Sequence, residues 1–273
     1  TVLGTHLEPT HARELFPCMD LPSCKAVFHL TLRGVPRNLQ AISNAPISRV
    51  ENYDEKVVAD KKSSATSGAS PTESQGRQQK QRSQHQSGQQ RTQAEEGLAA
   101  ATAVSETREL KTVVFEPTPI MPTYILGFWV GDFHFLTTQA LATDSSPSCP
   151  LFCCGGTPVP TLPEFALDMA RRAFELFSRL FSVPFPLPKL DVLGLPRMHG
   201  LGMENFGAIT LLEEYMLVTV ETSFVRRRRI ARLICHEVCH QWYGDVVTPQ
   251  SFDELWLKEG LARFFEYVAV DAL

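Results

Sequence analysis

The chain has 273 residues, of which 43% are hydrophobic and 21% are charged, and its formal net charge is −4. This length is enough to bury one large hydrophobic core or two modest ones. A nucleic-acid-binding protein needs an excess of basic residues to replace phosphate counterions, so the charge balance argues against that class. No run approaches the roughly 18 uninterrupted apolar residues of a membrane-spanning helix, so we expect no membrane segment.

The chain begins at Thr1 without an initiator methionine or a signal-peptide pattern, and it ends at Leu273 within a helical pattern. We therefore expect it to be an internal piece of a longer protein. Its seven cysteines are odd in number and irregularly spaced, which is not typical of a disulfide framework. A reducing, cytoplasmic location is the prediction that follows.

Short strand patterns mixed with prolines fill the first part of the chain. Residues 26–32 alternate apolar and polar side chains, as a half-buried strand does, and residues 41–44 are a further candidate. Strand patterns resume at 111–116 and 124–130. We expect these segments to pair as antiparallel strands.

A polar segment from about residue 59 to about residue 107 interrupts these strands, with nine glutamines between Gln75 and Gln93. Such a composition cannot bury enough apolar surface to offset the entropy lost on ordering. We therefore predict a disordered insertion at the tip of a hairpin. A prion-like role is the less favoured alternative.

Three cysteines, Cys149, Cys153 and Cys154, lie in a stretch rich in proline and glycine, which we expect to link two domains. A zinc knuckle would need a second pair of ligands at a suitable spacing, and the neighbouring sequence offers none. The domain boundary is therefore predicted near residue 155, without a metal site.

Beyond Pro163 the pattern becomes helical, with apolar side chains at every fourth residue from Phe165 to Phe177. Prolines end this helix, and residues 190–193 then have strand character. A second helix is expected over residues 222–243. Its four arginines at 226–229 are typical of a solvated helix start, and a nuclear signal or an anionic partner is the less favoured interpretation.

The sharpest signal is the pentapeptide His-Glu-Val-Cys-His at residues 236–240. Side chains four residues apart share one face of a helix, so His236 and His240 could bind one metal ion, with Glu237 as a base toward water. The pentapeptide alone does not exclude a buried helix with two solvated histidines. Glu259, nineteen residues beyond His240, lies in a further helical pattern that could pack antiparallel and supply a third ligand. Two imidazoles and a carboxylate suit zinc.

The His-Glu-x-x-His motif, followed by Glu259 within Trp-Leu-Lys-Glu-Gly, resembles the gluzincin aminopeptidases of the aminopeptidase N, puromycin-sensitive aminopeptidase and leukotriene hydrolase type. Further segments are similar to family segments and follow in the family's order: residues 8–13 with 16–20, 119–124, 185–189, and the exopeptidase motif at 202–205. The resemblance covers most of the chain outside the insertion.

By this resemblance, one zinc ion per chain is bound by His236, His240 and Glu259, and Glu237 is the general base. Glu204 binds the α-amino group of the substrate with help from Glu8, within a substrate-binding set that also contains Gly202, Met203 and Asn205. The charges agree, because an α-amino group with a pKa of about 7.7–8.0 is cationic at neutral pH and a glutamate is anionic. The motif segment also has the pattern of an edge strand, to which an extended peptide could add.

The resemblance implies a zinc aminopeptidase that hydrolyses the N-terminal residue from peptides with a free N-terminus. One alternative is a related zinc endopeptidase or epoxide hydrolase. The other is a catalytically silent fragment that binds zinc or peptide, because the family's oxyanion-stabilising tyrosine lies downstream of the third ligand, beyond Leu273. The expected fold is α+β, with an antiparallel β domain over residues 1–155 and the first half of a thermolysin-like catalytic domain over residues 156–273.

Four positions depart from the family pattern or stand out within it. Leu201 replaces a glycine at the start of the exopeptidase motif, and His6 replaces a glutamine near the first motif. Lys258 replaces an asparagine and adds a cation beside Glu259, and we expect it on the outer face of the helix. Cys239 is expected to pack on the side of its helix opposite to the metal, although the spacing leaves contact with the metal open.

Overall fold

The computed structural model describes residues 2–58, 105–141, 150–155 and 163–273. The chain divides into two compact units, of which the first contains Thr1–Asp54 with Glu109–Leu273 and the second contains Glu55–Arg108. The second unit includes the end of β4 (Ile47–Val58) and the start of β5 (Ser105–Phe115). The remainder of the predicted insertion at 59–107 lies outside the described residues. The candidate site lies wholly in the first unit.

The N-terminal strands form two three-stranded sheets. One has the order β1-β6-β3 with antiparallel neighbours, and its strands are Leu3–Gly4 (β1), Phe128–Gly131 (β6) and Gln40–Ser43 (β3). The other has the order β2-β5-β4, with β2 at Thr31–Pro36. Because β4 and β5 are neighbours, the prediction that the polar insertion joins two strands of a hairpin is confirmed.

Two of the predicted strands begin later than expected. The segment predicted at 26–32 enters β2 only at Thr31, and Ala26 forms an isolated bridge to Met121. Residues opposite this stretch include Pro117, Pro119 and Pro122, which lack the N–H that a regular ladder needs. The segment predicted at 124–130 starts as a 3₁₀ turn, η1 (Thr123–Ile125), before β6.

A mixed five-stranded sheet of order β10-β11-β9-β8-β7 follows, with strands at Gly202–Met203 (β10), Ala208–Leu212 (β11), Leu190–Leu195 (β9), Pro150–Gly155 (β8) and His134–Gln139 (β7). β9 runs parallel to both of its neighbours, and the two outer pairs are antiparallel. β10 lies at the edge, as predicted for the exopeptidase motif. Cys153 and Cys154 lie in β8, so the expected interdomain link is in part a strand of this sheet.

Three long helices complete the C-terminal part: α2 (Glu164–Phe181), α3 (Phe224–His240) and α4 (Leu255–Ala272). Shorter elements are α1 (Ala12–Leu15), η2 (Glu213–Tyr215) and η3 (Phe252–Glu254). The side chain of Ser223 caps α3 by accepting the backbone N–H of Arg226. α3 ends at His240 rather than at 243, because the chain turns at Gly244, whose φ of 136° suits only glycine.

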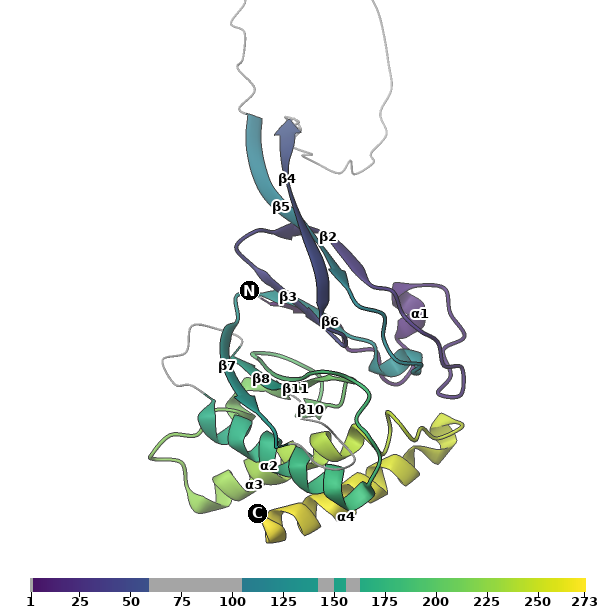
Figure 1. Cartoon of the computed structure of the whole chain (residues 1–273), viewed down its shortest axis with the longest axis vertical. Coiled ribbons are helices and arrows are strands. Elements are labelled where there is room, and N and C mark those ends of the chain that lie inside the picture. Colours follow the sequence, from purple (N-terminus) through teal and green to yellow (C-terminus); the bar gives the residue numbers. More distant parts are fainter. Residues whose placement is uncertain (1, 59–104, 142–149, 156–162) are drawn as a thin grey trace, which may run out of the picture. The chain divides into compact units, whose positions relative to one another are not determined.

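One large buried cluster joins the helices to the N-terminal segment. It contains Phe174 and Phe177 of α2 and Val238 of α3, and it also contains Leu7 and Tyr124 from the N-terminal part. Figure 1 shows α2, α3 and α4 packed together, with α2 against β7 and β8 of the mixed sheet and α4 against α3. Burial of Leu7 in this cluster brings the neighbouring Glu8 close to the helices.

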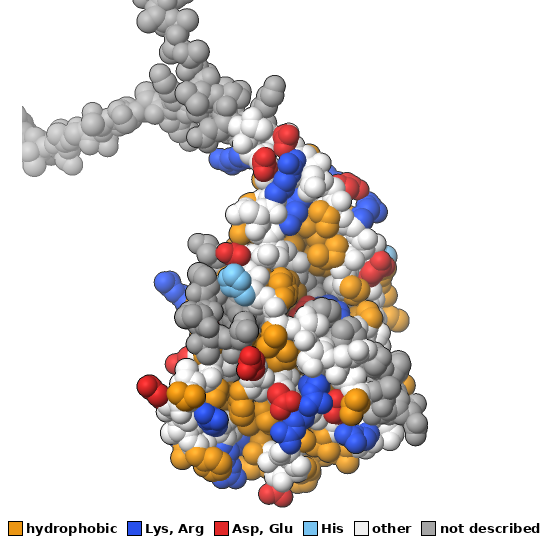
Figure 2. Space-filling model, turned by 60° about the vertical axis from the view of Figure 1, so that its left-hand side comes forward, with side chains coloured by type: hydrophobic (Ala, Val, Ile, Leu, Met, Phe, Trp, Pro, Cys, Tyr) orange, Lys and Arg blue, Asp and Glu red, His pale blue; other side chains and the backbone are white. Residues whose placement is uncertain are grey.

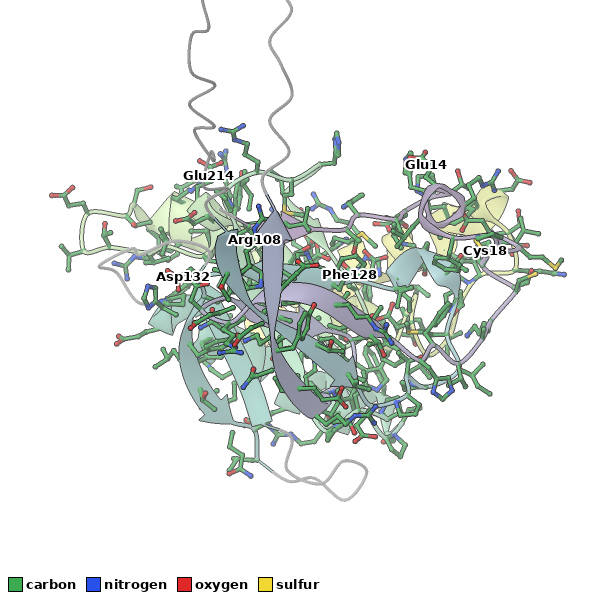
Figure 3. The ribbon with its side chains drawn as sticks, turned by 90° about the horizontal axis from the view of Figure 1, so that it is seen from above. Glu14, Cys18, Arg108, Phe128, Asp132 and Glu214 are labelled. Atoms are coloured by element: carbon green, nitrogen blue, oxygen red, sulfur yellow. The ribbon has the colours of Figure 1, made fainter. Side chains whose placement is uncertain are left out.

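The surface of the first unit carries charges of both signs, and Figure 2 shows acidic and basic side chains interspersed with apolar ones on one face. Figure 3 shows Glu14 and Cys18, on either side of the end of α1, on the opposite side of the molecule from Asp132. Among the residues that the structure describes, no helix combines the length and the apolar character needed to cross a membrane.

Candidate metal centre

The last two turns of α3 bring His236 and His240 together, because residues four apart on a helix lie on one face. Their Nε2 atoms are 3.0 Å apart. His240 is 1% exposed and His236 is partly buried, so the pair lies at the base of a pocket rather than on the surface. The alternative of two solvated histidines is therefore excluded by their placement.

Glu259 comes from the first turns of α4, which packs antiparallel to α3: Arg232 contacts Glu266, whereas His240 contacts Glu259. The Oε2 atom of Glu259 lies 3.4 Å from Nε2 of His236 and 3.6 Å from Nε2 of His240. The three residues predicted as ligands thus meet at one point, and they form a potential metal-binding group.

The spacing of these three donor atoms fits a zinc ion. Zinc binds imidazole nitrogen and carboxylate oxygen at about 2.0–2.2 Å, which places donors in a tetrahedral site about 3.3 Å apart. The observed separations run from 3.0 to 3.6 Å. Three protein donors would leave a fourth position for water or substrate, as catalytic zinc sites require.

Both histidines are oriented by hydrogen bonds from their other ring nitrogen. Nδ1 of His240 lies 2.8 Å from the backbone carbonyl of Tyr243, which can only accept, so Nδ1 donates and Nε2 keeps its lone pair for a metal. Nδ1 of His236 lies 3.1 Å from Oε2 of Glu266. Glu266 is 2% exposed and its other oxygen accepts from Arg232 and Arg263.

Glu266 is a residue that the sequence reasoning missed. It lies seven residues beyond Glu259, which is two helical turns and therefore the same face of α4. This seven-residue spacing was the only feature of the sequence that we could connect with Glu266. It does not distinguish a second carboxylate near the metal from an ordinary surface charge.

Glu237 is 4% exposed, and its Oε2 atom has no hydrogen-bond partner among the residues that the structure describes. Burial raises the pKa of Glu237 to about 8, against the opposing effect of His236 and with a further contribution from Glu204. The oxygen without a protein partner, beside His236 and in the lining of the same pocket, is the property that a general base needs.

Gly202, on the edge strand β10, lies directly against Glu237. A Cβ atom at this position would overlap with Oε1 of Glu237 and crowd the rest of its carboxyl group. The absence of a side chain at residue 202 therefore allows the base to reach the pocket. Leu201, which replaces a family glycine, is 45% exposed and lines the cavity.

Alternation along the exopeptidase motif separates its residues into two sets. Gly202 and Glu204 line the cavity, whereas Met203 and Asn205 are 2% and 0% exposed and do not. The amide of Asn205 donates to the carbonyl oxygen of Ile125 at 3.2 Å. The structure thus places these two predicted substrate-binding side chains in the interior.

Lys258 does not lie on the outer face of α4, and that expectation was wrong. It is 2% exposed, and its Nζ atom lies 2.8 Å from Oε1 of Glu8 and 2.8 Å from Oε1 of Glu259. It also donates a hydrogen bond to Oε1 of Glu204. The two carboxylates predicted to bind a substrate amine are therefore brought together, but with a lysine ammonium between them.

The two carboxylates differ in their protonation. Burial raises the pKa of Glu8 to about 7, with a further increase from Glu204 and a decrease from Lys258. For Glu204, burial acts in the same upward direction, but Lys258 outweighs it and holds the pKa below its ordinary value. Glu204 is therefore the firmly ionised member of the pair.

A cavity of about 550 Å³ connects these groups. Besides the histidines and glutamates it is lined by Tyr215, Leu233 and three arginines, which are Arg229, Arg232 and Arg263. Sequence reasoning interpreted Arg229 as part of a solvated helix start and missed the contribution of the others. Cys239 is buried in the hydrophobic core and is absent from the group of potential metal ligands, as expected.

Comparison with known proteins gives two family matches and several relatives. Residues 165–273 match the peptidase family M1 domain, and residues 1–70 match the peptidase M1 N-terminal domain. The chain is 31% identical to aminopeptidase M1 of Arabidopsis thaliana, over 98% of this chain and 24% of that protein. It is 29% identical to tricorn protease-interacting factor F2 of Thermoplasma volcanium, over 100% and 27%, and 28% identical to leucyl aminopeptidase of Saccharolobus solfataricus, over 100% and 27%. The chain spans about a quarter of the length of these relatives.

Proposed function

The chain belongs to peptidase family M1, and on that basis we propose that it carries the metal centre of a zinc aminopeptidase, which removes the N-terminal residue from peptides. The observation that carries this proposal is the pair of clusters that share Glu259. One of its oxygens faces His236 and His240, and the other lies in the group formed with Glu8 and Glu204. The candidate metal site thus lies next to an acidic subsite that suits the α-amino group at the N-terminus of a peptide.

The metal cluster supports hydrolysis by activated water. When bound, zinc supplies a Lewis acid that polarises the scissile carbonyl and makes water more acidic. Glu237 accepts a proton from the attacking water and delivers it to the leaving amine. Its unpartnered oxygen supports this role, and Gly202 keeps the path to the pocket open.

The acidic cluster supports cleavage at the N-terminus rather than inside a chain. Glu204 and Glu8 attract an α-ammonium group, and because they lie next to the metal ligand Glu259 they leave space for one residue before the scissile bond. A peptide in extended form could align along the edge strand β10 through its backbone. Arg232 and Arg263 fix Glu266, which in turn orients His236.

The test is hydrolysis of a short peptide by the chain after addition of zinc, with the products identified by mass spectrometry. We expect release of the N-terminal residue, loss of that release with a chelator, and its recovery with zinc. Glu237→Gln should keep the bound zinc but lose about 10²–10⁴ in rate, because only the base is removed. Glu214→Gln, at an exposed glutamate outside the cavity, is the matched control.

Three results would contradict the proposal. Cleavage within the peptide would indicate an endopeptidase, and full activity of Glu237→Gln would exclude the assigned base. Zinc binding without any cleavage would favour the alternative of a fragment that binds zinc and peptide only.

A further inference from the structure

We propose that Lys258 is a built-in cation of the amino-group subsite, and that it determines specificity by weakening the preference of this site for free N-termini. The inference rests on the proposed function, because it takes Glu8 and Glu204 as the groups that receive the substrate's N-terminus. It goes beyond that function by giving a role to Lys258, which opposes the binding of a substrate ammonium group by Glu8 and Glu204.

The geometry around the Lys258 ammonium is that of an occupied cation site. One oxygen from each of Glu8, Glu204 and Glu259 lies within 4.8 Å of the others. The Nζ atom of Lys258 lies 2.8 Å from the Glu8 oxygen and 2.8 Å from the Glu259 oxygen, and it donates to the Glu204 oxygen. A substrate ammonium has the same charge and the same three donors, so it would compete for the same oxygens.

The lysine is held in this position by its surroundings. Lys258 is 2% exposed, and its Nζ atom lies 5.4 Å from the centre of the Tyr124 ring. The hydroxyl of Tyr124 donates to the carbonyl of Gly244 at 3.0 Å. A Cβ atom at Gly244 would come within 3.3 Å of Cδ of Lys258, so the glycine leaves space for the lysine stem. The ammonium is therefore placed by packing as well as by charge.

The carboxylate oxygens that face Lys258 leave little for an incoming ligand. Its Nζ atom lies 2.8 Å from Oε1 of Glu8 and 2.8 Å from Oε1 of Glu259, and it donates to Oε1 of Glu204. The Glu8 oxygen is itself buried. A substrate amine that binds to any of these three oxygens would therefore have to share it with the lysine or displace the lysine.

The charge count gives the direction of the effect. Glu8, Glu204 and Glu259 offer at most three negative charges, and Lys258 already supplies one positive charge. The ammonium of Lys258 contacts all three carboxylates, and nearby negative charges favour its charged form. A substrate ammonium then adds a second cation to the same space, whereas an acetylated N-terminus adds none. The usual advantage of the free amine is thereby reduced.

The experiment measures binding of leucinamide and of N-acetyl-leucinamide to the zinc-loaded chain by calorimetry. In the unsubstituted chain we expect the two affinities to differ by less than about tenfold. Lys258→Met, which keeps the stem and removes the charge, should tighten leucinamide binding by about tenfold to hundredfold, the worth of hydrogen bonds to a charged group, and leave the acetylated ligand nearly unchanged. Lys258→Arg keeps the charge and is the control. We expect its ratio of leucinamide affinity to N-acetyl-leucinamide affinity to equal that of the unsubstituted chain.

Each outcome decides the matter. A strong preference of the unsubstituted chain for leucinamide, or an unchanged ratio in Lys258→Met, would overturn the proposal. If Lys258→Met does not fold, Lys258→Asn carries the same expectation with a smaller, uncharged side chain. Zinc content, measured separately by atomic absorption, reports on the metal centre: a chain that binds no zinc would refute the proposed function, while the affinity ratio still tests Lys258.

Discussion

Replacing Gly202 by alanine tests whether the general base depends on a missing side chain. An added methyl group would overlap with Oε1 of Glu237 and crowd its Cδ and Cγ atoms. Gly202 is not among the glycines of positive φ, so its backbone conformation is open to alanine. The clash with Glu237 is then the obstacle, and the carboxyl group must move out of the pocket to relieve it.

The magnitude follows from the burial of the two residues. Inserting a methyl group into a well-packed interior costs about 1–3 kcal/mol. We expect the lower end of this range, because the carboxyl end of Glu237 lines the cavity and can move. Displacing a general base removes a contribution of about 10²–10⁴ to the rate. The three atoms nearest to an added Cβ at residue 202 all belong to Glu237 and none belongs to a zinc ligand, so we expect bound zinc to be unchanged.

The assay combines urea denaturation, zinc content and release of the N-terminal residue from a peptide. Gly260→Ala is the matched control, because a Cβ there meets open space within α4 and should stabilise the chain by up to about 1 kcal/mol. In a Glu237→Ala background the clash disappears, so Gly202→Ala should then cost almost nothing. An equal cost in both backgrounds, or normal activity of Gly202→Ala, would refute the reasoning.

Three further outcomes are expected elsewhere in the first unit. Glu266→Gln should weaken zinc binding by about 10–100-fold, because it loosens His236, and competition with a chromogenic chelator will show unchanged affinity if this is wrong. Lys189→Met should cost about 3–5 kcal/mol in urea denaturation, because it leaves the buried Asp191 carboxylate without its cation and removes hydrogen bonds to the carbonyl oxygens of Ser43 and Gly207; a cost below about 1 kcal/mol would contradict it. Burial, with help from the nearby His199, lowers the pKa of His6, so protonation opposes folding and stability falls as pH drops through that lowered pKa. The melting temperature of His6→Gln should therefore fall by less than that of the parent chain between about pH 7 and about pH 5. An equal fall in the two proteins would contradict this.

The elements that periodicity predicted best are those whose sequence repeats over several turns. The apolar residues from Phe165 to Phe177 predicted α2 nearly to its ends. Strands β7, β8 and β11 were missed, since each is short and none shows clear alternation bounded by turn residues. Their pairing also carries the mixed sheet across residue 155, so strands on both sides of the predicted domain boundary share one sheet. The boundary itself stays a prediction.

The metal cluster could be predicted because helical spacing fixes the relation between His236 and His240, and the helical pattern around Glu259 offers a partner. Orientation within the exopeptidase motif follows from strand alternation, yet resemblance alone placed Met203 and Asn205 in the substrate-binding set. Glu266 could not be separated from a surface charge, because its significance depends on the packing of α3 against α4.

Lys258 and Glu259 are neighbours, and consecutive side chains on a helix point about 100° apart. That offset supports the expectation that one faces the site and the other faces solvent, but it holds only where one side of the helix is open. The start of α4 has α3 on one side and Glu8 with Tyr124 on the other, so both directions lead into the interior. A buried lysine is stable there because carboxylates surround it. Glu259 consequently faces the histidines with one oxygen and Lys258 with the other, so a change at residue 258 acts on the metal cluster and the amine subsite together.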